Sequence, residues 1–292
     1  MNRTALALLL ALPLAAFAQL KAVSDTVIGG FTHPESVGCD PINKAIYASE
    51  FGSKLAPMEK DGAGYISKWS LAGKLIEKNF LPGDKGEKLN KPKGIWVHGN
   101  RLWTTDIDSA WVFDLKTKKG RRLAIPGIQF ANDPMVRGGA LYVTDNRGDQ
   151  VFRIEPADFL HAKGEPKITT VFKDAKVNPN GIWPAKGGTI VVGFVAPDQP
   201  RAIYQLGKDG QPKAISDPIG RLDGVYELRD RSLLVTDWNS GSLLQWSKKA
   251  GMQKLAEGFK GPADFCVITG KTSLTAYVPD LVQSQVRIIE LR

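Results

Sequence analysis

Six short segments of one design recur along the chain, and the residue at their second position changes from copy to copy. The segments are 34–37, 92–95, 131–134, 179–182, 222–225 and 262–265. Their second positions hold Glu35, Lys93, Asn132, Asn180, Asp223 and Ala263. Four of these side chains carry carboxylate or amide oxygens, the ligands that hard divalent cations prefer. If the segments are structurally equivalent, the sequence predicts a ring of oxygen ligands around a cation.

A simpler interpretation of the four residues stays open. Asn and Asp are common where a strand begins after a turn, so each could have a purely local role. Four oxygen-bearing residues at equivalent positions favour a shared site. Other catalytic patterns are weak, because His33, His98 and His161 are dispersed and no Gly-x-Ser-x-Gly segment marks a serine nucleophile.

The spacing of the segments predicts the fold that would position the ring. Consecutive second positions lie 58, 39, 48, 43 and 40 residues apart, a period typical of four-stranded β-propeller blades. Each segment is followed by turn residues and a β-rich run, as at 102–106, 141–145 and 233–237. These runs end in a Thr-Asp pair, which we expect to be a hairpin-turn feature.

The two ends of the chain predict how the ring of blades closes. The sequence stops after the β-rich run 285–291, which leaves the sixth unit without an outer strand. Residues 21–29 resemble 213–220, the outer strand of the fifth unit. We therefore expect an all-β, six-bladed β-propeller in which the N-terminal strand completes the last blade and removes an exposed sheet edge.

The two cysteines lie in the units that meet at this closure. Cys39 is in the first unit and Cys266 in the sixth. In an oxidising compartment they could form a disulfide across the closure. The alternative is that they are two small buried residues, since unpaired cysteine packs as a hydrophobe.

The N-terminal residues predict export. Arg3, an apolar run at 5–16 and the small-x-small site Ala16-Phe17-Ala18 have the order of a cleaved signal peptide. We expect residues 1–18 to be removed and 19–292 to form one periplasmic domain. No later apolar run is long enough to span a membrane.

The net charge of +9 does not point to nucleic acid. The basic cluster at 116–122 occupies an expected turn between outer strands and lacks aromatic stacking partners. The sequence shows no sign of oligomerisation, and we expect a monomer that acts on a small molecule.

The motif order resembles a known family across the whole of 19–292. Pro34-Glu35-Ser36, Asn132-Asp133, Pro179-Asn180-Gly181-Ile182 and Leu222-Asp223-Gly224-Val225 resemble the SMP-30/gluconolactonase/luciferin-regenerating-enzyme family of six-bladed propellers. The resemblance implies one divalent cation, Ca²⁺ foremost with Zn²⁺, Mn²⁺ or Mg²⁺ as alternatives, held by Glu35, Asn180 and Asp223. It also implies hydrolysis of a lactone or small ester, with Asp223 as general base and Asn132 contacting the substrate or a bound water.

Phe130 departs from this family. Its sugar-lactone enzymes often place an arginine two residues before the Asn-Asp motif, where this chain has Phe130. We expect Phe130 to contact substrate and to favour one less polar than a sugar lactone. A column of Trp96, Met135, Trp183 and Tyr226 would either pack between blades or line the well.

Two other functions remain open at this point. A propeller without enzymatic activity could bind a peptide, glycan or protein at its rim, through Trp111, Trp238 and the basic cluster 116–122. A related enzyme, similar to strictosidine-synthase-like proteins, could use the same well for a different reaction.

Overall fold

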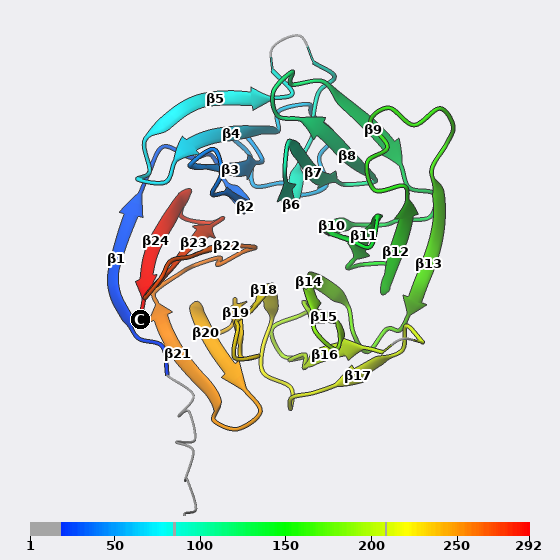
Figure 1. Ribbon diagram of the computed structural model, residues 1–292. Helices are drawn as coiled ribbons and strands as arrows, with labels where there is room; N and C mark the ends of the chain where they lie inside the picture. The colour runs from blue at the N-terminus through cyan, green and yellow to red at the C-terminus, as the bar shows by residue number, and fades with distance from the viewer. Residues whose placement is uncertain (1–18, 84–85, 208) are drawn as a thin grey trace, which may run out of the picture.

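The computed structural model describes residues 19–83, 86–207 and 209–292, and every regular element in these ranges is a β-strand. The strands form six four-stranded sheets arranged as blades around a central axis (Figure 1). The predicted all-β six-bladed propeller is confirmed. The predicted signal peptide, residues 1–18, lies outside the described residues. Within those described, no helix is long and apolar enough to cross a bilayer.

In five blades the innermost strand comes first in the chain, and three antiparallel strands follow outward. The first blade contains β2 (Pro34–Asp40), β3 (Ala45–Glu50), β4 (Tyr65–Ser70) and β5 (Leu75–Leu81). The second contains β6 (Pro92–His98), β7 (Arg101–Asp106), β8 (Ser109–Asp114) and β9 (Gly120–Ala124). The third contains β10 (Ala131–Arg137), β11 (Ala140–Asp145), β12 (Gln150–Glu155) and β13 (Lys167–Lys173). The fourth contains β14 (Pro179–Ala185), β15 (Gly188–Gly193), β16 (Ile203–Leu206) and β17 (Pro212–Ala214). The fifth contains β18 (Leu222–Glu227), β19 (Leu233–Asp237), β20 (Ser242–Ser247) and β21 (Gly251–Glu257).

The sixth blade joins the two ends of the chain. It contains β22 (Cys266–Thr269), β23 (Leu274–Asp280), β24 (Gln285–Leu291) and, outermost, β1 (Ala22–Ile28). The antiparallel pairing of β1 with β24 is continued by the Lys21 N–H, which donates to the Arg292 carbonyl at 2.8 Å. The predicted closure by the N-terminal strand is thus confirmed. The assignment of 213–220 to the fifth unit was wrong, because β17 at the start of that segment is the outer strand of the fourth blade.

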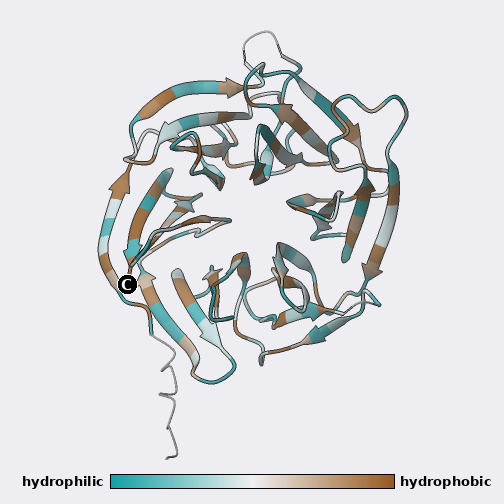
Figure 2. Cartoon of the chain, viewed as in Figure 1, coloured by the Kyte–Doolittle hydropathy of each residue, from teal (hydrophilic) through white to brown (hydrophobic). Residues whose placement is uncertain are grey.

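The hydrophobic core lies mainly between neighbouring blades. Between the second and third blades, for example, Val112 and Ala110 share a buried cluster with Leu141 and Val143. A middle strand is covered on both faces, and its apolar residues therefore follow one another instead of alternating strictly. The outermost strands are mixed in hydropathy, as Figure 2 shows, because one of their faces meets solvent.

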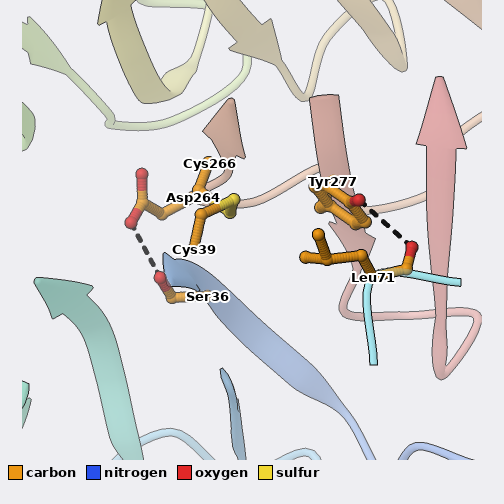
Figure 3. The surroundings of a disulfide bond; sticks show 6 residues. All are labelled: Ser36, Cys39, Leu71, Asp264, Cys266 and Tyr277. Atoms are coloured by element: carbon orange, nitrogen blue, oxygen red, sulfur yellow. Dashed lines mark hydrogen bonds between the residues drawn. A yellow bond between two sulfur atoms is a disulfide. The ribbon is translucent and has the colours of Figure 1, made fainter. Parts of the chain in front are cut away.

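A disulfide between Cys39 and Cys266 links the first blade to the last (Figure 3). The Cα atoms are 5.6 Å apart and the cysteines are separated by 227 residues in sequence. Backbone hydrogen bonds reinforce the junction, because the Val37 N–H donates to the Asp264 carbonyl and the Asp264 N–H to the Glu35 carbonyl, each at 3.2 Å. The structure thereby selects the disulfide over the alternative of two unpaired buried cysteines.

Candidate metal site on the propeller axis

The polar residues of the six segments take equivalent places in the blades. Glu35, Lys93, Asn132, Asn180 and Asp223 are each the second residue of an innermost strand, and Ala263 precedes β22. The innermost strands surround the axis in Figure 1, so the strand ends that carry these residues lie around a common centre. Below, these six positions are called the axial ring.

A break in strand pairing coincides with each of the five ring residues that lie in a strand. The register shifts between Pro92 and Ile95 in β6, and at the same place in β10, β14 and β18. In β2 it shifts between Pro34 and Ser36. Irregularities of this kind bend a strand locally and re-aim a side chain. The residue after the bulged position is often glycine, since a Cβ on Gly181 would lie 2.1 Å from the Asp223 carbonyl oxygen.

The recurrent Thr-Asp pair holds this irregular backbone in place. Asp145 accepts hydrogen bonds from the N–H groups of Gln129 and Phe130, at 3.1 and 2.8 Å, just before Asn132. Thr144 accepts from the Asp133 N–H at 2.8 Å and donates to the carbonyl of Asn180 in the next blade at 2.7 Å. Satisfying buried backbone groups in this way fixes the bulge. The pair, expected to serve only its own hairpin, therefore positions ring residues in two blades.

The same arrangement recurs in the fifth blade. Asp237 accepts from the Arg221 N–H at 2.9 Å, while Thr236 accepts from Gly224 and donates to the carbonyl of Ala263. The repetition of Thr-Asp in the sequence was the signal for this role. The contacts of the Thr-Asp pair with the next blade form only when the blades are assembled around the axis.

Four side-chain oxygens of the axial ring lack hydrogen-bond partners among the described residues. Glu35, Asn132, Asn180 and Asp223 are 2–6 % exposed. Within the described residues, Glu35 Oε2 and the Oδ1 atoms of the other three accept no hydrogen bond. Buried polar atoms are nearly always partnered in folded proteins, and each orphan costs about 1–3 kcal/mol. Four orphaned oxygens at equivalent positions fit the oxygen ligand set of a hard cation.

The donor set relies on amides as well as carboxylates. Among the described ranges, no three His, Cys, Asp or Glu side chains converge in a way that could hold a metal. Asn132 and Asn180 would therefore have to contribute oxygens beside Glu35 and Asp223. Such neutral and anionic oxygens suit Ca²⁺ better than Zn²⁺, which favours nitrogen and sulfur.

Negative charge dominates the electrostatics of the axis. Burial raises the pKa of Glu35 well above its usual value, and the nearby carboxylates of Asp223 and Asp264 raise it further. The pKa of Asp223 is also raised, first by burial and then by Asp264. The pKa of Asp133 is raised as well, first by burial and then by the neighbouring carboxylates, Asp264 foremost. A bound cation would relieve this repulsion and lower these pKa values.

Lys93 places one positive charge inside the ring. It is fully buried, and burial lowers its pKa to about 8 although Glu35 acts in the opposite direction. Its ammonium donates to the Lys91 carbonyl at 3.2 Å and lies 4.4 Å from the centre of the Phe130 ring. Lys93 therefore partly neutralises Glu35 and would weaken the attraction of the ring for a metal ion.

Phe130 and Trp238 lie beside the ring residues. The Phe130 ring has the Lys93 ammonium near it and the Arg147 guanidinium 5.0 Å from its centre. Trp238 donates its Nε1–H to Asp223 Oδ2 at 2.9 Å. Trp238, considered above for a rim surface, thus contacts the candidate site itself.

The rim residues named for partner binding are less available than expected. Trp111 is only 2 % exposed and stacks on Phe113, with ring centres 5.5 Å apart. Its assignment to an exposed rim surface was wrong, because its strand β8 is covered by neighbouring elements. In the basic cluster, Lys118 pairs with Glu77 at 2.6 Å and Arg122 with Asp108 at 2.8 Å.

The aromatic column lies away from the ring. Trp96, Trp183 and Tyr226 are each the fifth residue of an innermost strand and line a cavity of about 140 Å³ that none of the ring side chains reaches. Met135, the fourth member, is fully buried in packing between blades. Of the two roles expected for the column, packing between blades is confirmed, since Trp96, Trp183 and Tyr226 all pack against buried clusters there. The column does not line the ring end of the axis, because its residues stand three positions further along their strands.

His33 is held by the last blade. The ring nitrogen Nδ1 of His33 lies 3.0 Å from the Leu281 carbonyl oxygen, and the backbone N–H of His33 donates to Ser284 Oγ at 3.2 Å. These contacts explain its placement near the closure.

Comparison with known proteins supports the fold. No protein-family model matches the chain, and no curated protein matches its sequence. Among solved structures, virginiamycin B lyase from Staphylococcus aureus aligns with a TM-score of 0.63 and 16% identity, covering 94% of this chain and 99% of that one. A streptogramin B lyase aligns with a TM-score of 0.62 and 12% identity, covering 92% and 97%. A catalytically inactive variant of the Staphylococcus aureus enzyme, solved with quinupristin, aligns with a TM-score of 0.59 and 14% identity. That alignment covers 94% of this chain and 99% of the other. At these identities the comparison shows that the chain shares the fold of these proteins.

Proposed function

We propose that the chain is an exported, divalent-cation-dependent hydrolase of a lactone or small ester, similar to the SMP-30/gluconolactonase family. The observation that carries the proposal is the set of four orphaned oxygens at equivalent ring positions. The order of the motifs along the chain supports the reaction class. The disulfide supports export, because such bonds persist in oxidising compartments.

The ring residues would hold the cation through their orphaned oxygens. Glu35, Asn180 and Asp223 are the proposed ligands, with Ca²⁺ as the preferred ion. When bound, the cation would polarise the substrate carbonyl and stabilise negative charge on its oxygen.

The side chains of the ring would manage the proton. In lactone hydrolysis the oxygen of water bonds to the carbonyl carbon, the ring C–O bond breaks, and the proton lost by water ends on the released alkoxide. Asp223 is suited to take up that proton, since its Oδ1 is free of other partners within the described residues. The hydrogen bond from Trp238 holds the carboxylate in one orientation. Asn132 would orient the substrate without adding charge.

Lys93 and Phe130 would shape the substrate preference. The Lys93 ammonium is a fixed positive charge that could stabilise an anionic oxygen in the transition state. Phe130 offers an apolar face where an arginine would bind sugar hydroxyls. We therefore propose a substrate with an apolar ring or acyl chain in preference to a sugar lactone.

The test is hydrolysis of a panel of lactones and aryl esters with Ca²⁺, Zn²⁺ or EDTA. We expect turnover that EDTA abolishes and one cation restores, and that Asp223→Asn removes. Asp158→Asn, at an exposed aspartate paired with Arg101, is the control and should retain full activity. Full activity in EDTA, or in Asp223→Asn, would refute the proposed chemistry.

A lyase reaction is a second candidate, favoured by the buried Lys93. A lysine whose pKa falls to about 8 can act as a base near neutral pH, and the structural neighbours named above are lyases. Such a base could remove a proton from carbon while a C–O bond breaks on the adjacent carbon, with no water consumed. Mass spectrometry separates the reactions, because hydrolysis adds one water to the product and elimination adds nothing.

A further inference from the structure

A second set of side chains lines the axis beyond the ring. A cavity of about 140 Å³ lies there, bounded by residues from all six innermost strand segments. Its aromatic residues stand three positions after the ring residues, or about 10 Å further along the strands. A cavity near this volume accepts a ligand of about the size of benzene.

Three aromatic rings form part of the cavity wall. Trp96 and Trp183 have ring centres 5.2 Å apart with planes at 51°, and Trp183 and Tyr226 have centres 4.5 Å apart at 46°. All three are only partly buried, so the wall that they form reaches the surface. Inclined aromatic faces grouped in this way are the usual means of binding an organic ammonium ion.

Two carboxylates complete the cavity. Asp133 and Asp264 both line it. Asp133 is 3 % exposed, and its Oδ1 has no hydrogen-bond partner within the described residues. Asp264 accepts hydrogen bonds from Ser36 Oγ, at 2.7 Å (Figure 3), and from the Phe265 backbone N–H. Carboxylates held in a largely apolar cavity call for a cation or a proton.

The combination of carboxylate, aromatic and aliphatic side chains around the cavity indicates the class of cation that it would bind. A hard metal ion seeks six or more oxygens, whereas this cavity offers two carboxylates and otherwise mainly apolar and aromatic side chains. Val37, Ile95 and the Cys39–Cys266 disulfide also line it. An ammonium ion bearing small alkyl groups satisfies both features, since its charge meets the carboxylates and its alkyl groups meet the rings.

We propose that this cavity is a second ligand site, which binds a small organic ammonium ion between the Trp96–Trp183–Tyr226 wall and the Asp133 and Asp264 carboxylates. The site is separate from the axial ring and does not depend on the hydrolase assignment. Its occupant would be a free amine or quaternary ammonium compound, or such a group on a larger molecule entering from the aromatic end.

Calorimetric titration of the purified protein with tetramethylammonium chloride tests the proposal. A titration with NaCl of equal ionic strength corrects for salt, and tert-butanol is the uncharged probe of similar shape. We expect saturable binding with a dissociation constant on the order of 1 mM for the ammonium ion, and at least about tenfold weaker binding of tert-butanol. Equal binding of the two probes, or no heat beyond that of NaCl, would overturn the proposal.

Substitutions of the cavity residues test where the ammonium ion binds. Tyr226→Leu removes one ring and should weaken binding about five- to tenfold, whereas the matched Tyr226→Phe keeps the ring face and should change it less than about twofold. Asp133→Asn, nearly equal in size, should also weaken binding about tenfold. Thermal unfolding of each variant checks that the propeller is intact.

Asp223→Asn separates this site from the axial ring. Asp223 does not line the cavity, so this variant should still bind tetramethylammonium after its affinity for Ca²⁺ has fallen. Loss of ammonium binding in Asp223→Asn but not in Tyr226→Leu would place the ion in the ring and refute a second site.

Discussion

Replacing Asp264 by asparagine should stabilise the metal-free protein at alkaline pH. Besides burial, the charge of Asp264 raises the pKa values of Glu35, Asp133 and Asp223, and burial raises its own pKa from 3.8 to about 7. Asparagine keeps an oxygen that can accept the hydrogen bond from Ser36 but carries no charge. The substitution therefore isolates the cost of one buried negative charge.

The sign of the effect follows from proton linkage. Because the pKa is raised in the folded state, the folded protein binds more protons than the unfolded chain between about pH 4 and pH 7. Stability therefore falls as the pH rises through that window, and it is highest near its acid end. The shift from 3.8 to about 7 corresponds to about 4 kcal/mol, at about 1.4 kcal/mol per unit. This is an upper bound, since the side chain is partly exposed to the cavity.

Urea unfolding in EDTA at pH 4.5 and pH 8 measures the effect. Asp264→Asn should raise the free energy of unfolding at pH 8 by up to about 4 kcal/mol and change it little at pH 4.5. The control Asp158→Asn alters an exposed ion pair and should change stability by less than about 1 kcal/mol at both pH values. A destabilised Asp264→Asn protein at pH 8 would refute the prediction, because it would mean that neighbouring groups stabilise the Asp264 charge.

Three further predictions concern the ring and the closure. Glu35→Gln should abolish the rise in melting temperature that Ca²⁺ produces in the wild-type protein, as followed by thermal unfolding with and without EDTA, because one of two ligand carboxylates is lost. Lys93→Met should bind Ca²⁺ about tenfold more tightly in calorimetry, since the competing positive charge beside Glu35 is removed; unchanged or weaker binding would contradict the electrostatic role of Lys93. The double variant Cys39→Ala/Cys266→Ala should lose up to about 5 kcal/mol of unfolding free energy, because the disulfide closes a very long loop, and equal stability of the two proteins in urea would refute this.

The repeat in the sequence was enough to predict the architecture. A propeller blade is a local unit, and its strands, turns and entry segment lie within about 40 consecutive residues. The spacing of the segments therefore predicted the number of blades, and the likeness of 21–29 to 213–220 predicted the closure. The ring positions Glu35, Asn132, Asn180 and Asp223 could be named for the same reason, since equivalent residues of a repeat occupy equivalent places.

The pairing of contacts across blades was decided by the tertiary structure. Whether Cys39 and Cys266 form a disulfide depends on the distance between β2 and β22, and the period of the repeat does not determine that distance. The second role of Thr144, which donates to the Asn180 carbonyl, likewise requires two blades to meet at one angle. The burial of Trp111 is also a property of its neighbours.

Only the fold determined which side chains lie at each end of the axis and how their charges balance. Along a strand, three residues are enough to move a side chain from the ring to a separate cavity, and the bulge at the strand start alters which way each one points. The sequence named Asp223 and Tyr226 without determining that they serve different ends of one axis. It placed Lys93 in the ring, but its role as a buried counter-charge to Glu35 depends on desolvation, which exists only once the six blades close.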